Sequence, residues 1–539
     1  MNTAARHVIG IDIGTQSTKA VLVSAEGRIV AQASRAYQVE TPKPLWAQQW
    51  PDVWLDAVQA SICDVLADAD VDAASVHALC ISSLYGGSGI PVDAGGNALY
   101  PCLIWMDRRA QAEVEWVRAN VDVDRLMKIT GNGVDSYYGY TKMLWLRENE
   151  PEVWRRTDQF LPPNSYVIAR LTGEVAVDQS SAGNIGGVYD LAARGWSEEA
   201  LRMLGIPLSM MPARLLESSA VVGGLQPDWG LRLGLPTGTP VVAGGVDAAV
   251  ATLAAGAAQP GKHVAMIGTS MCWGTIRQDV DARHGLISMP HVFRGAQDLY
   301  VFGGAITAGA SVTWFRETFC QAEIAAGAAA GIDPHVLLEQ DAATLPPGSD
   351  GILFLPYLMG ERSPVWDAQA SGSFVGLSLH HGRPHLYRAV LEGISYALHH
   401  NMLAGVKGVG AIDPRLVVVG GASHSDLWMQ IIADVTGREV FTIRQDVEAS
   451  LGAAMLAALG VGLIDEDQVQ QGWVQPTPRA SPRADAHRRY AALFEQYLAL
   501  YPALKPVMHR LREIVKEAPA TKLEPCATMI GTVKPAQEP

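Results

Sequence analysis

Residues 8–23 read VIGIDIGTQSTKAVLV and combine a carboxylate with side chains that commonly hold phosphate groups. Asp12 lies inside an otherwise apolar strand, where a carboxylate is costly to bury unless a cation or several hydrogen-bond donors accompany it. The turn that follows offers glycine, hydroxyl, amide and ammonium groups at Gly14, Thr15, Gln16, Ser17 and Lys19. We therefore predict a phosphate-binding hairpin in which Asp12 faces the accompanying Mg²⁺, directly or through water. The alternative is an ordinary hairpin with a polar turn, in which Lys19 lies on the solvent side of its strand.

A similar pattern recurs at Ile267-Gly268-Thr269-Ser270, which also follows an apolar strand and contains a Gly-Thr turn. Such a turn presents backbone N–H groups and a hydroxyl group, although most turns of this composition bind nothing. Two hairpins of this kind facing each other would clamp a triphosphate between two domains. The repeat therefore favours a nucleotide site that both halves of the chain build together.

Asp247 is the leading candidate for a general base. It follows Gly244 and Gly245, which let a substrate approach the backbone, and it precedes an Ala-rich helix whose N-terminus would point at a cleft. A carboxylate in this position can accept the proton of a hydroxyl group that attacks a phosphate. The alternative role is that of an N-cap, because an aspartate before an Ala-rich helix is a common capping arrangement. The two roles are compatible.

The composition is typical of a well-packed protein of more than one domain. The chain has 539 residues, of which 48% are hydrophobic and 18% charged, so two or more substantial cores can form. A formal net charge of −14 argues against a nucleic-acid partner, because no basic excess is available to neutralise phosphates. The six cysteines show no paired spacing, which is typical of reduced thiols in a cytoplasmic protein. We expect neither a secretory leader nor a membrane span, since glycines and Asp247 interrupt the most apolar run, 241–258.

Strand-like runs alternate with longer amphipathic stretches, which predicts an α/β architecture. The predicted strands are 8–13, 19–24, 77–83, 240–244, 263–268, 299–303 and 415–419. The predicted helices are 51–68, 108–119, 194–204, 384–404, 425–436 and 448–459. A loop rich in Pro, Gly and Thr before the strand at 240 marks a domain boundary. We therefore expect an N-terminal domain over 1–243, a C-terminal domain over 244–515 and a flexible tail over 516–539.

The order of these motifs resembles that of the FGGY family of carbohydrate kinases over most of the chain. The hairpin at Asp12 resembles the first phosphate motif of that family, and 244–247, 268–270 and 419–423 resemble its catalytic, second phosphate and adenosine motifs. Residues 372–392, GSFVGLSLHHGRPHLYRAVLE, resemble its C-terminal signature. Residues 137–149 resemble its N-terminal signature except at Gly139, where a small hydroxyl residue or proline is usual. Residues 105–108 and 355–364 resemble the xylulokinase branch.

The resemblance implies an α/β fold with two ribonuclease-H-like domains of the actin-like ATPase fold around a central cleft. It also implies an ATP-dependent sugar kinase that uses Mg²⁺ and closes on its substrate to exclude water. Asp247 would be the catalytic base, and Asp12 would handle the metal. The residues implied to hold ATP and its phosphates are Asp12, Thr15, Gln16, Ser17, Lys19, Gly268, Thr269, Gly309, Thr313, Gly420, Gly421 and Ser425. For Gly420 and Gly421 the alternative is a tight strand-to-helix turn.

The resemblance is weaker at the sugar site. The implied substrate residues are Leu84, Tyr85, Gly86, Trp105, Asp107, Asp247 and Ala248. Tyr85 stands where xylulokinases typically have histidine, and Ala248 stands where they commonly have asparagine. Because a site built to bond a hydroxyl group discriminates strongly, both departures argue against D-xylulose itself. The lack of the Arg-Glu pair that glycerol kinases usually show in this loop argues against glycerol. The alternative for Trp105 and Asp107 is an aromatic side chain packed beside a surface ion pair.

We expect phosphorylation of a hydroxyl group on a ketose such as a pentulose, or on a polyol. One rival is a kinase for another small molecule, such as a signal diol or a modified pentulose. A second rival is a non-catalytic, nucleotide-dependent protein on the same fold, which would bind ATP without turnover. A NAD-dependent dehydrogenase is disfavoured, because no GxGxxG opens a helix after the first strand. Many relatives form dimers, so a homodimer is the candidate assembly, although no residue requires it.

Overall fold

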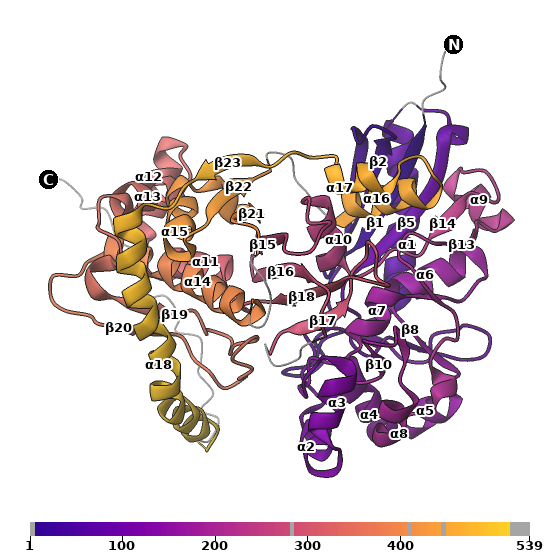
Figure 1. Cartoon of the computed structure of the whole chain (residues 1–539), viewed down its shortest axis with the longest axis horizontal. Helices are drawn as coiled ribbons and strands as arrows, with labels where there is room; N and C mark the ends of the chain where they lie inside the picture. Colours follow the sequence, from indigo (N-terminus) through magenta and orange to yellow (C-terminus); the bar gives the residue numbers. More distant parts are fainter. Residues whose placement is uncertain (1–5, 70, 281–284, 407–411, 444–448, 518–539) are drawn as a thin grey trace, which may run out of the picture.

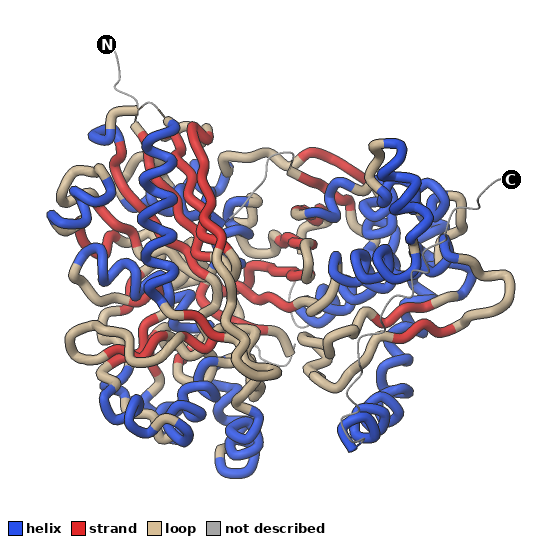
Figure 2. The backbone as a smooth tube through the Cα atoms, turned by 180° about the vertical axis from the view of Figure 1, so that it is seen from behind, coloured by secondary structure: helices blue, strands red, loops and turns tan. Residues whose placement is uncertain are grey.

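The fold is described from a computed structural model, which describes residues 6–69, 71–280, 285–406, 412–443 and 449–517. Two large β-sheets lie side by side, each with helices packed on it, and a group of helices lies between them (Figure 1). Five further sheets among the described residues have two strands each. Seen from behind, strands run through the first half, whereas the second half has strands along its inner and upper side with helices gathered beside them (Figure 2). The α/β architecture predicted from the alternating pattern is confirmed.

The first sheet has the strand order β13-β14-β5-β1-β2-β3. β1 pairs antiparallel with β2 and parallel with β5, which places Asp12 between Lys19 on one neighbour and Ser82 on the other. Side chains alternate along β1, so that Ile9 and Ile11 enter one core while Val8 enters the other. The strands are β1 (His7–Ile13), β2 (Ser17–Ser24), β3 (Ile29–Ala36), β5 (Val76–Ser83), β13 (Val221–Gly224) and β14 (Pro240–Val242).

The second sheet has the order β17-β18-β16-β15-β21-β22-β23 and repeats the pairing of the first. β15 pairs antiparallel with β16 and parallel with β21, as β1 does with β2 and β5. The two Gly-Thr turns seen in the sequence thus end equivalent first strands, at Ile13 and at Ile267. The strands are β15 (His263–Ile267), β16 (Met271–Arg277), β17 (Ile287–Pro290), β18 (Leu299–Gly303), β21 (Arg415–Val419), β22 (Glu439–Thr442) and β23 (Thr477–Ala480).

Helices α10 (Asp247–Ala254) and α16 (Ala449–Gly460) lie between the two sheets (Figure 1). One hydrophobic core joins Val8 of the first sheet, Val250 of α10 and Val264 of the second sheet. α16 packs directly on β1, where a Cβ added to Gly10 would lie 1.9 Å from the Ser450 carbonyl oxygen. The chain therefore returns to the first sheet long after leaving it, and the start of α10 lies between the two halves.

The outer faces of both sheets carry longer helices. α1 (Pro51–Asp68) packs on β2 and β3, and α14 (Arg383–Gly405) packs on β16 and β18. α1 begins after Trp50 with Pro51 at its first position, as predicted, because proline has no N–H to leave unbonded there. The other helices around the second sheet are α11 (Gly309–Phe319), α12 (Gln321–Ala330), α13 (Pro334–Ala343) and α15 (Asp426–Thr436).

Smaller elements complete the first half, and α2, α3, α4 and α8 lie below its sheet (Figure 1). The helices are α2 (Gln111–Asn120), α3 (Val123–Thr130), α4 (Gly139–Asn149), α5 (Pro151–Arg156), α6 (Pro163–Thr172), α7 (Gln179–Asn184), α8 (Glu198–Leu204) and α9 (Pro227–Leu233). The strands are β4 (Gln48–Gln49), β6 (Ile90–Val92), β7 (Cys102–Leu103), β8 (Gln159–Leu161), β9 (Val177–Asp178), β10 (Tyr189–Asp190), β11 (Gly195–Trp196) and β12 (Leu215–Leu216). The predicted helix at 194–204 begins later, because β11 occupies its first residues.

The second half ends in a long helix, α18 (Ala484–Glu517), which extends past β19 (Leu353–Leu355) and β20 (Ser373–Val375) (Figure 1). A short helix, α17 (Glu466–Gln471), precedes it. The expected tail over 516–539 lies outside the described residues from 518 onward, and its first two residues belong to α18. Within the described ranges, every helix is either too short or too polar to cross a membrane.

Candidate active site

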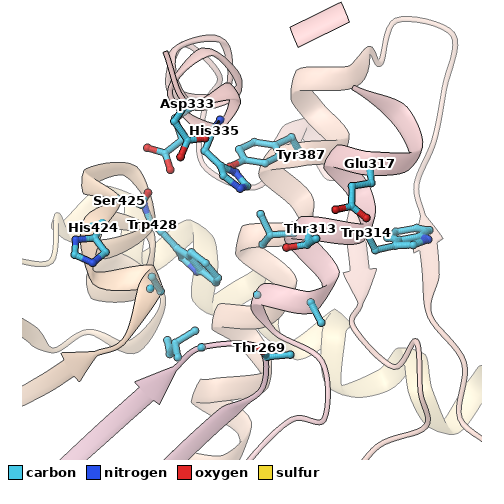
Figure 3. Close-up of a pocket in the computed structure, with 18 of the residues that line it drawn as sticks. Thr269, Thr313, Trp314, Glu317, Asp333, His335, Tyr387, His424, Ser425 and Trp428 are labelled. Atoms are coloured by element: carbon cyan, nitrogen blue, oxygen red, sulfur yellow. Dashed lines mark hydrogen bonds between the residues drawn. The ribbon is translucent and has the colours of Figure 1, made fainter. Parts of the chain in front are cut away.

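A cavity of about 940 Å³ opens on the second half at the end of β15 (Figure 3). It brings together five parts of the chain: the turn after β15, helix α11, the start of α13, Tyr387 of α14 and the turn after β21. Six of the residues that the sequence assigns to nucleotide binding line it, namely Gly268, Thr269, Gly309, Thr313, Gly421 and Ser425. Gly420 immediately precedes this lining, with its φ in the left-handed region at 90°.

The turn at Thr269 is fixed to the N-terminus of α11 by backbone hydrogen bonds. The Thr269 carbonyl accepts from the N–H groups of Ala308 and Ala310, at 2.9 and 3.0 Å. The Gly309 N–H donates to the Gly268 carbonyl at 2.9 Å, and a Cβ at Gly309 would lie 2.5 Å from that oxygen. Glycine is therefore required at 309 for the phosphate turn and the helix to meet.

The sequence did not reveal the side chains that form the far wall of this cavity. Trp314, Asp333, His335, Tyr387 and Trp428 line it together with Glu317 and Glu339 (Figure 3). Ser425 is the N-cap residue of α15, and its hydroxyl accepts the backbone N–H of Trp428 at 3.0 Å. The Trp428 indole N–H is buried with no hydrogen-bond partner among the described residues, which leaves it able to donate to a ligand. Aromatic walls with a few polar groups are typical of sites for a nucleotide base.

The N-terminal hairpin places Asp12 on the sheet face that α10 and α16 cover. Ser82 Oγ donates to Asp12 Oδ1 at 2.8 Å, from the neighbouring strand β5. In the turn, the Thr15 hydroxyl accepts the Trp105 indole N–H at 3.1 Å. The structure thus joins one residue assigned to phosphate binding, Thr15, to one assigned to the sugar, Trp105.

The other residues of the N-terminal hairpin, Gln16, Ser17 and Lys19, have different surroundings. Gln16 is exposed, and its carbonyl accepts the Tyr37 N–H at 2.9 Å, while the Ser17 carbonyl accepts the Gly14 N–H at 2.9 Å. Lys19 lines a different cavity, of about 330 Å³, together with residues of β3 and Ser450 of α16. The structure therefore does not bring Lys19 to the lining of the large cavity.

Asp247 is the first residue of α10, at the junction between the two halves. The N-cap residue is Val246, so Asp247 is not the N-cap that the sequence offered as an alternative. Val246 is held by the Ser180 hydroxyl, which accepts its N–H at 3.1 Å, and Asp247 Oδ1 accepts the Ala248 N–H at 2.6 Å. Burial, and to a smaller extent the charge of Asp12, raises the pKa of Asp247 well above the usual range of an aspartate.

Asp12 and Asp247 lie close enough for the charge of Asp12 to raise the pKa of Asp247, and this pair of carboxylates suits a divalent cation. A carboxylate whose pKa is raised by a neighbouring carboxylate is stabilised in its charged form when a cation lies near both. In the part of the chain that the structure describes, no three His, Cys, Asp or Glu side chains gather as metal ligands. This donor set fits Mg²⁺, which keeps several waters and is usually held by one or two carboxylates plus substrate phosphates.

The implied sugar loop, Leu84–Gly86, is packed against α4. The Gly139 N–H donates to the Tyr85 hydroxyl at 2.6 Å, and the Tyr85 and Tyr137 rings lie 4.9 Å apart. A Cβ at Gly139 would lie 1.9 Å from the Gly87 carbonyl oxygen. Tyr85 and Gly139, two of the three departures from the family pattern, are therefore in direct contact.

Asp107 is buried and its carboxylate is occupied by neighbours. Oδ2 accepts the Ala47 N–H at 2.7 Å and the Arg109 Nε–H at 2.8 Å, and Oδ1 accepts the Arg109 backbone N–H at 3.0 Å. The Arg109 guanidinium lies 3.7 Å from the centre of the Trp46 ring. The ion pair beside Trp105 is thus a buried one, not the surface pair considered from the sequence, and it holds the loop that carries Trp105.

A loop of the second half reaches Tyr137 of the first. Trp366 lies 6.0 Å from the Tyr138 ring, stacked on it, and 6.2 Å from the Tyr137 ring. Its indole N–H donates to the Gly285 carbonyl at 2.6 Å. Asp367, the next residue, accepts a hydrogen bond from the Tyr501 hydroxyl of α18, so the C-terminal helix supports this loop.

Comparison with known proteins identifies the family to which the chain belongs. Residues 7–254 match the model for the N-terminal domain of the FGGY family of carbohydrate kinases, and residues 263–461 match the model for its C-terminal domain. A xylulose kinase of Bacillus subtilis (strain 168) is 30% identical over 516 residues, which are 95% of this chain and 100% of the relative. A gluconokinase of Bacillus licheniformis is 30% identical over 502 residues, 93% of this chain and 96% of the relative.

The crystal structure of a ligand-bound xylulose kinase from Lactobacillus acidophilus superposes with a TM-score of 0.85 at 27% identity, and the match covers 94% of this chain and 100% of that one. The fold is therefore the two-domain α/β fold of these kinases, with ribonuclease-H-like domains of the actin-like ATPase type. The chain belongs to the FGGY family of carbohydrate kinases, which phosphorylate sugars.

Proposed function

We propose that this protein transfers the γ-phosphoryl group of ATP to a hydroxyl group of a small polyhydroxylated substrate, with Asp247 as the general base. The observation that supports it most is the position of Asp247, which begins the helix between the two sheets and lies near Asp12. Two features support the choice of a nucleotide as the phosphoryl donor: the two equivalent hairpins and the large cavity on the second half.

In the proposed reaction, the substrate hydroxyl oxygen forms a bond to the γ-phosphorus while the bond from that phosphorus to the bridging oxygen breaks, releasing ADP. The hydroxyl proton passes to the Asp247 carboxylate. A carboxylate whose pKa is raised by burial and by a neighbouring charge is a stronger base than an exposed aspartate. Thr269 and Gly309 would contact the phosphates at the start of α11, whose N-terminus favours negative charge.

Asp12 would hold Mg²⁺, which when bound neutralises charge on the phosphates. The domains expected over 1–243 and 244–515 would carry the sugar and the nucleotide respectively, and their closure would exclude water from the transfer. We place the substrate beside Asp247, Trp105 and Tyr137, because Trp105 donates to Thr15 of the phosphate turn and the charge of Asp247 acts on Tyr137.

The test is ATP consumption with Mg²⁺ against a panel of ketoses, polyols and sugar acids. Asp247→Asn keeps the shape of the side chain but removes its basicity, and we expect kcat to fall about 10²–10⁴-fold. The matched control is Asp228→Asn, because Asp228 is also an aspartate in the first turn of a helix, α9, but is exposed. ATP binding with no turnover on any compound, or an unchanged rate for Asp247→Asn, would contradict the proposal.

A further inference from the structure

Asp178 is a buried carboxylate whose charge is compensated by neutral hydrogen-bond donors. It ends β9 and is 1% exposed. Its Oδ1 accepts the Ser180 hydroxyl at 2.5 Å and the Ser181 N–H at 2.8 Å, and its Oδ2 accepts from Asn164 Nδ2 at 2.9 Å. Because burying a carboxylate is costly even with such donors, we looked for a role that a neutral side chain would not perform.

Capping of α7 explains one of these three contacts. Asp178 is the N-cap residue of α7, and its side chain accepts the Ser181 N–H in that role. Serine or asparagine caps a helix about as well as aspartate does, without burying a charge. The contacts of Asp178 with Ser180 and Asn164 therefore need a different explanation.

Both of these partners connect Asp178 to the loop 243–246, which leads from β14 to α10. The Ser180 hydroxyl accepts the Val246 N–H at 3.1 Å, and Asn164 Nδ2 donates to the Ala243 carbonyl at 3.1 Å. Ser180 and Asn164 are fully buried, so both bridges lie out of solvent. One carboxylate thus holds the first and the last residue of this loop through two single-residue bridges.

The charge of Asp178 fixes the direction of both bridges. An ionised carboxylate accepts hydrogen bonds and donates none, so the Ser180 hydroxyl must donate to it and present a lone pair to the Val246 N–H. For the same reason Asn164 must turn its NH2 group toward Asp178, which leaves that group free to donate to Ala243 as well. A hydroxyl that donates to a charged group is also a better acceptor. A neutral side chain at position 178 would leave both orientations open.

The loop 243–246 is closely packed and leads directly into Asp247. Gly244 has its φ in the left-handed region, at 69°. A Cβ added to Gly245 would lie 2.6 Å from Ser180 Oγ. Because Asp247 follows Val246 in the chain, a shift of Val246 would move the Asp247 carboxylate with it.

We propose that Asp178 is a positioning residue for Asp247, which it holds in place through the two bridges without contacting the substrate. The inference rests on the proposed function, because it takes Asp247 as the general base. A misplacement of about 1 Å can lower the rate of a reaction about 10²-fold. Asp178 should therefore act on kcat, and it should leave the KM for ATP unchanged because other elements line the 940 Å³ cavity.

The first experiment measures steady-state kinetics of Asp178→Asn in the full-length protein, with a compound that the parent phosphorylates. Asparagine keeps the shape of the side chain and caps α7, but its NH2 group faces a donor at one of the two bridges. We expect kcat to fall about 10²-fold with an unchanged KM for ATP. Ser180→Ala removes the bridge to Val246 alone and should lower kcat by a smaller factor, about 10-fold.

Two further variants separate positioning from a general loss of folded protein. Asp434→Asn is the matched control, because Asp434 is also fully buried but pairs with Arg483 at 2.6 Å in the second half. It should lower the denaturation midpoint and leave kcat per folded molecule unchanged. In an Asp247→Asn background, Asp178→Asn should change the residual kcat less than about threefold, because no base is left to position.

Hydrogen exchange gives a readout that needs no turnover. In Asp178→Asn and in Ser180→Ala, the Val246 amide should exchange at least about tenfold faster than in the parent, because its acceptor is misdirected or missing. Mass spectrometry of the intact protein, exchanged without substrate and then digested, measures this rate. Asp434→Asn should leave it unchanged.

The outcomes separate this inference from the proposed function. A parental kcat for Asp178→Asn, while Asp247→Asn is inactive, would overturn the inference and leave the kinase assignment standing. A second 10²-fold fall in the Asp247→Asn background would also overturn it, because Asp178 would then act independently of the base. Absence of all turnover, or a parental rate for Asp247→Asn, would refute the proposed function, and the exchange rate of Val246 would still decide whether Asp178 holds the loop.

Discussion

The Tyr85 hydroxyl caps a helix to which it does not belong, and this leads to a quantitative prediction. Gly139 is the first residue of α4, so its N–H has no partner within the helix, and the N-cap residue Tyr138 makes no side-chain cap bond. The N–H donates instead to Tyr85 at 2.6 Å, in a buried position. Tyr85→Phe removes the oxygen while keeping the ring, and leaves a buried N–H unsatisfied.

We expect Tyr85→Phe to lower the free energy of unfolding by about 1–3 kcal/mol, the cost of orphaning a buried donor. The matched control is Tyr396→Phe, because the Tyr396 hydroxyl is also buried but has no hydrogen-bond partner among the described residues. Deleting that hydroxyl should be neutral or stabilising. Urea denaturation followed by intrinsic fluorescence compares the two variants with the parent. If Tyr85→Phe were as stable as the parent, or Tyr396→Phe lost as much, the capping argument would be refuted.

Three further predictions concern other parts of the structure. Gly309→Ala should lower kcat/KM for ATP about 10²-fold, because the added Cβ would displace the Gly268 carbonyl. Gly195→Ala is the control, since the space around its Cβ is open and its kcat/KM should not change. Steady-state kinetics measures both variants. Arg388→Met should lower the free energy of unfolding by about 3–5 kcal/mol, since it leaves the Glu392 carboxylate buried without its cation, and a denaturation midpoint close to the parent's would contradict this. Burial lowers the pKa of Lys142 to about 7, so the unfolded chain binds more protons than the native protein above that pH. Native stability should therefore gain up to about 1.4 kcal/mol per pH unit from this residue between pH 7 and 10, and Lys142→Met, compared by denaturation across that range, should lose this slope.

Much of the framework could be predicted from local pattern. The helix at 51–68 and the strands at 299–303 and 415–419 coincide with the observed elements, because apolar periodicity and Pro51 are local signals. The two Gly-Thr hairpins were also visible, since each lies within a few consecutive residues.

Contacts between distant segments could not be predicted in the same way. Tyr387 and Trp428 lie in helices, where their spacing is the same whether they face a core or a cavity. The hydrogen bond between Tyr85 and Gly139 joins a loop to the start of a helix, and no pattern in the sequence links these two positions.

The position of α16 has a consequence for how the chain is made. During synthesis the ribosome releases β1, β2 and β5 long before residues 449–460 emerge, yet α16 covers one face of the sheet that these strands form. Until then Gly10 and its neighbours expose apolar surface that only a late segment can cover. We therefore expect the N-terminal half to remain partly folded until α16 is synthesised, and a fragment ending before residue 449 should aggregate.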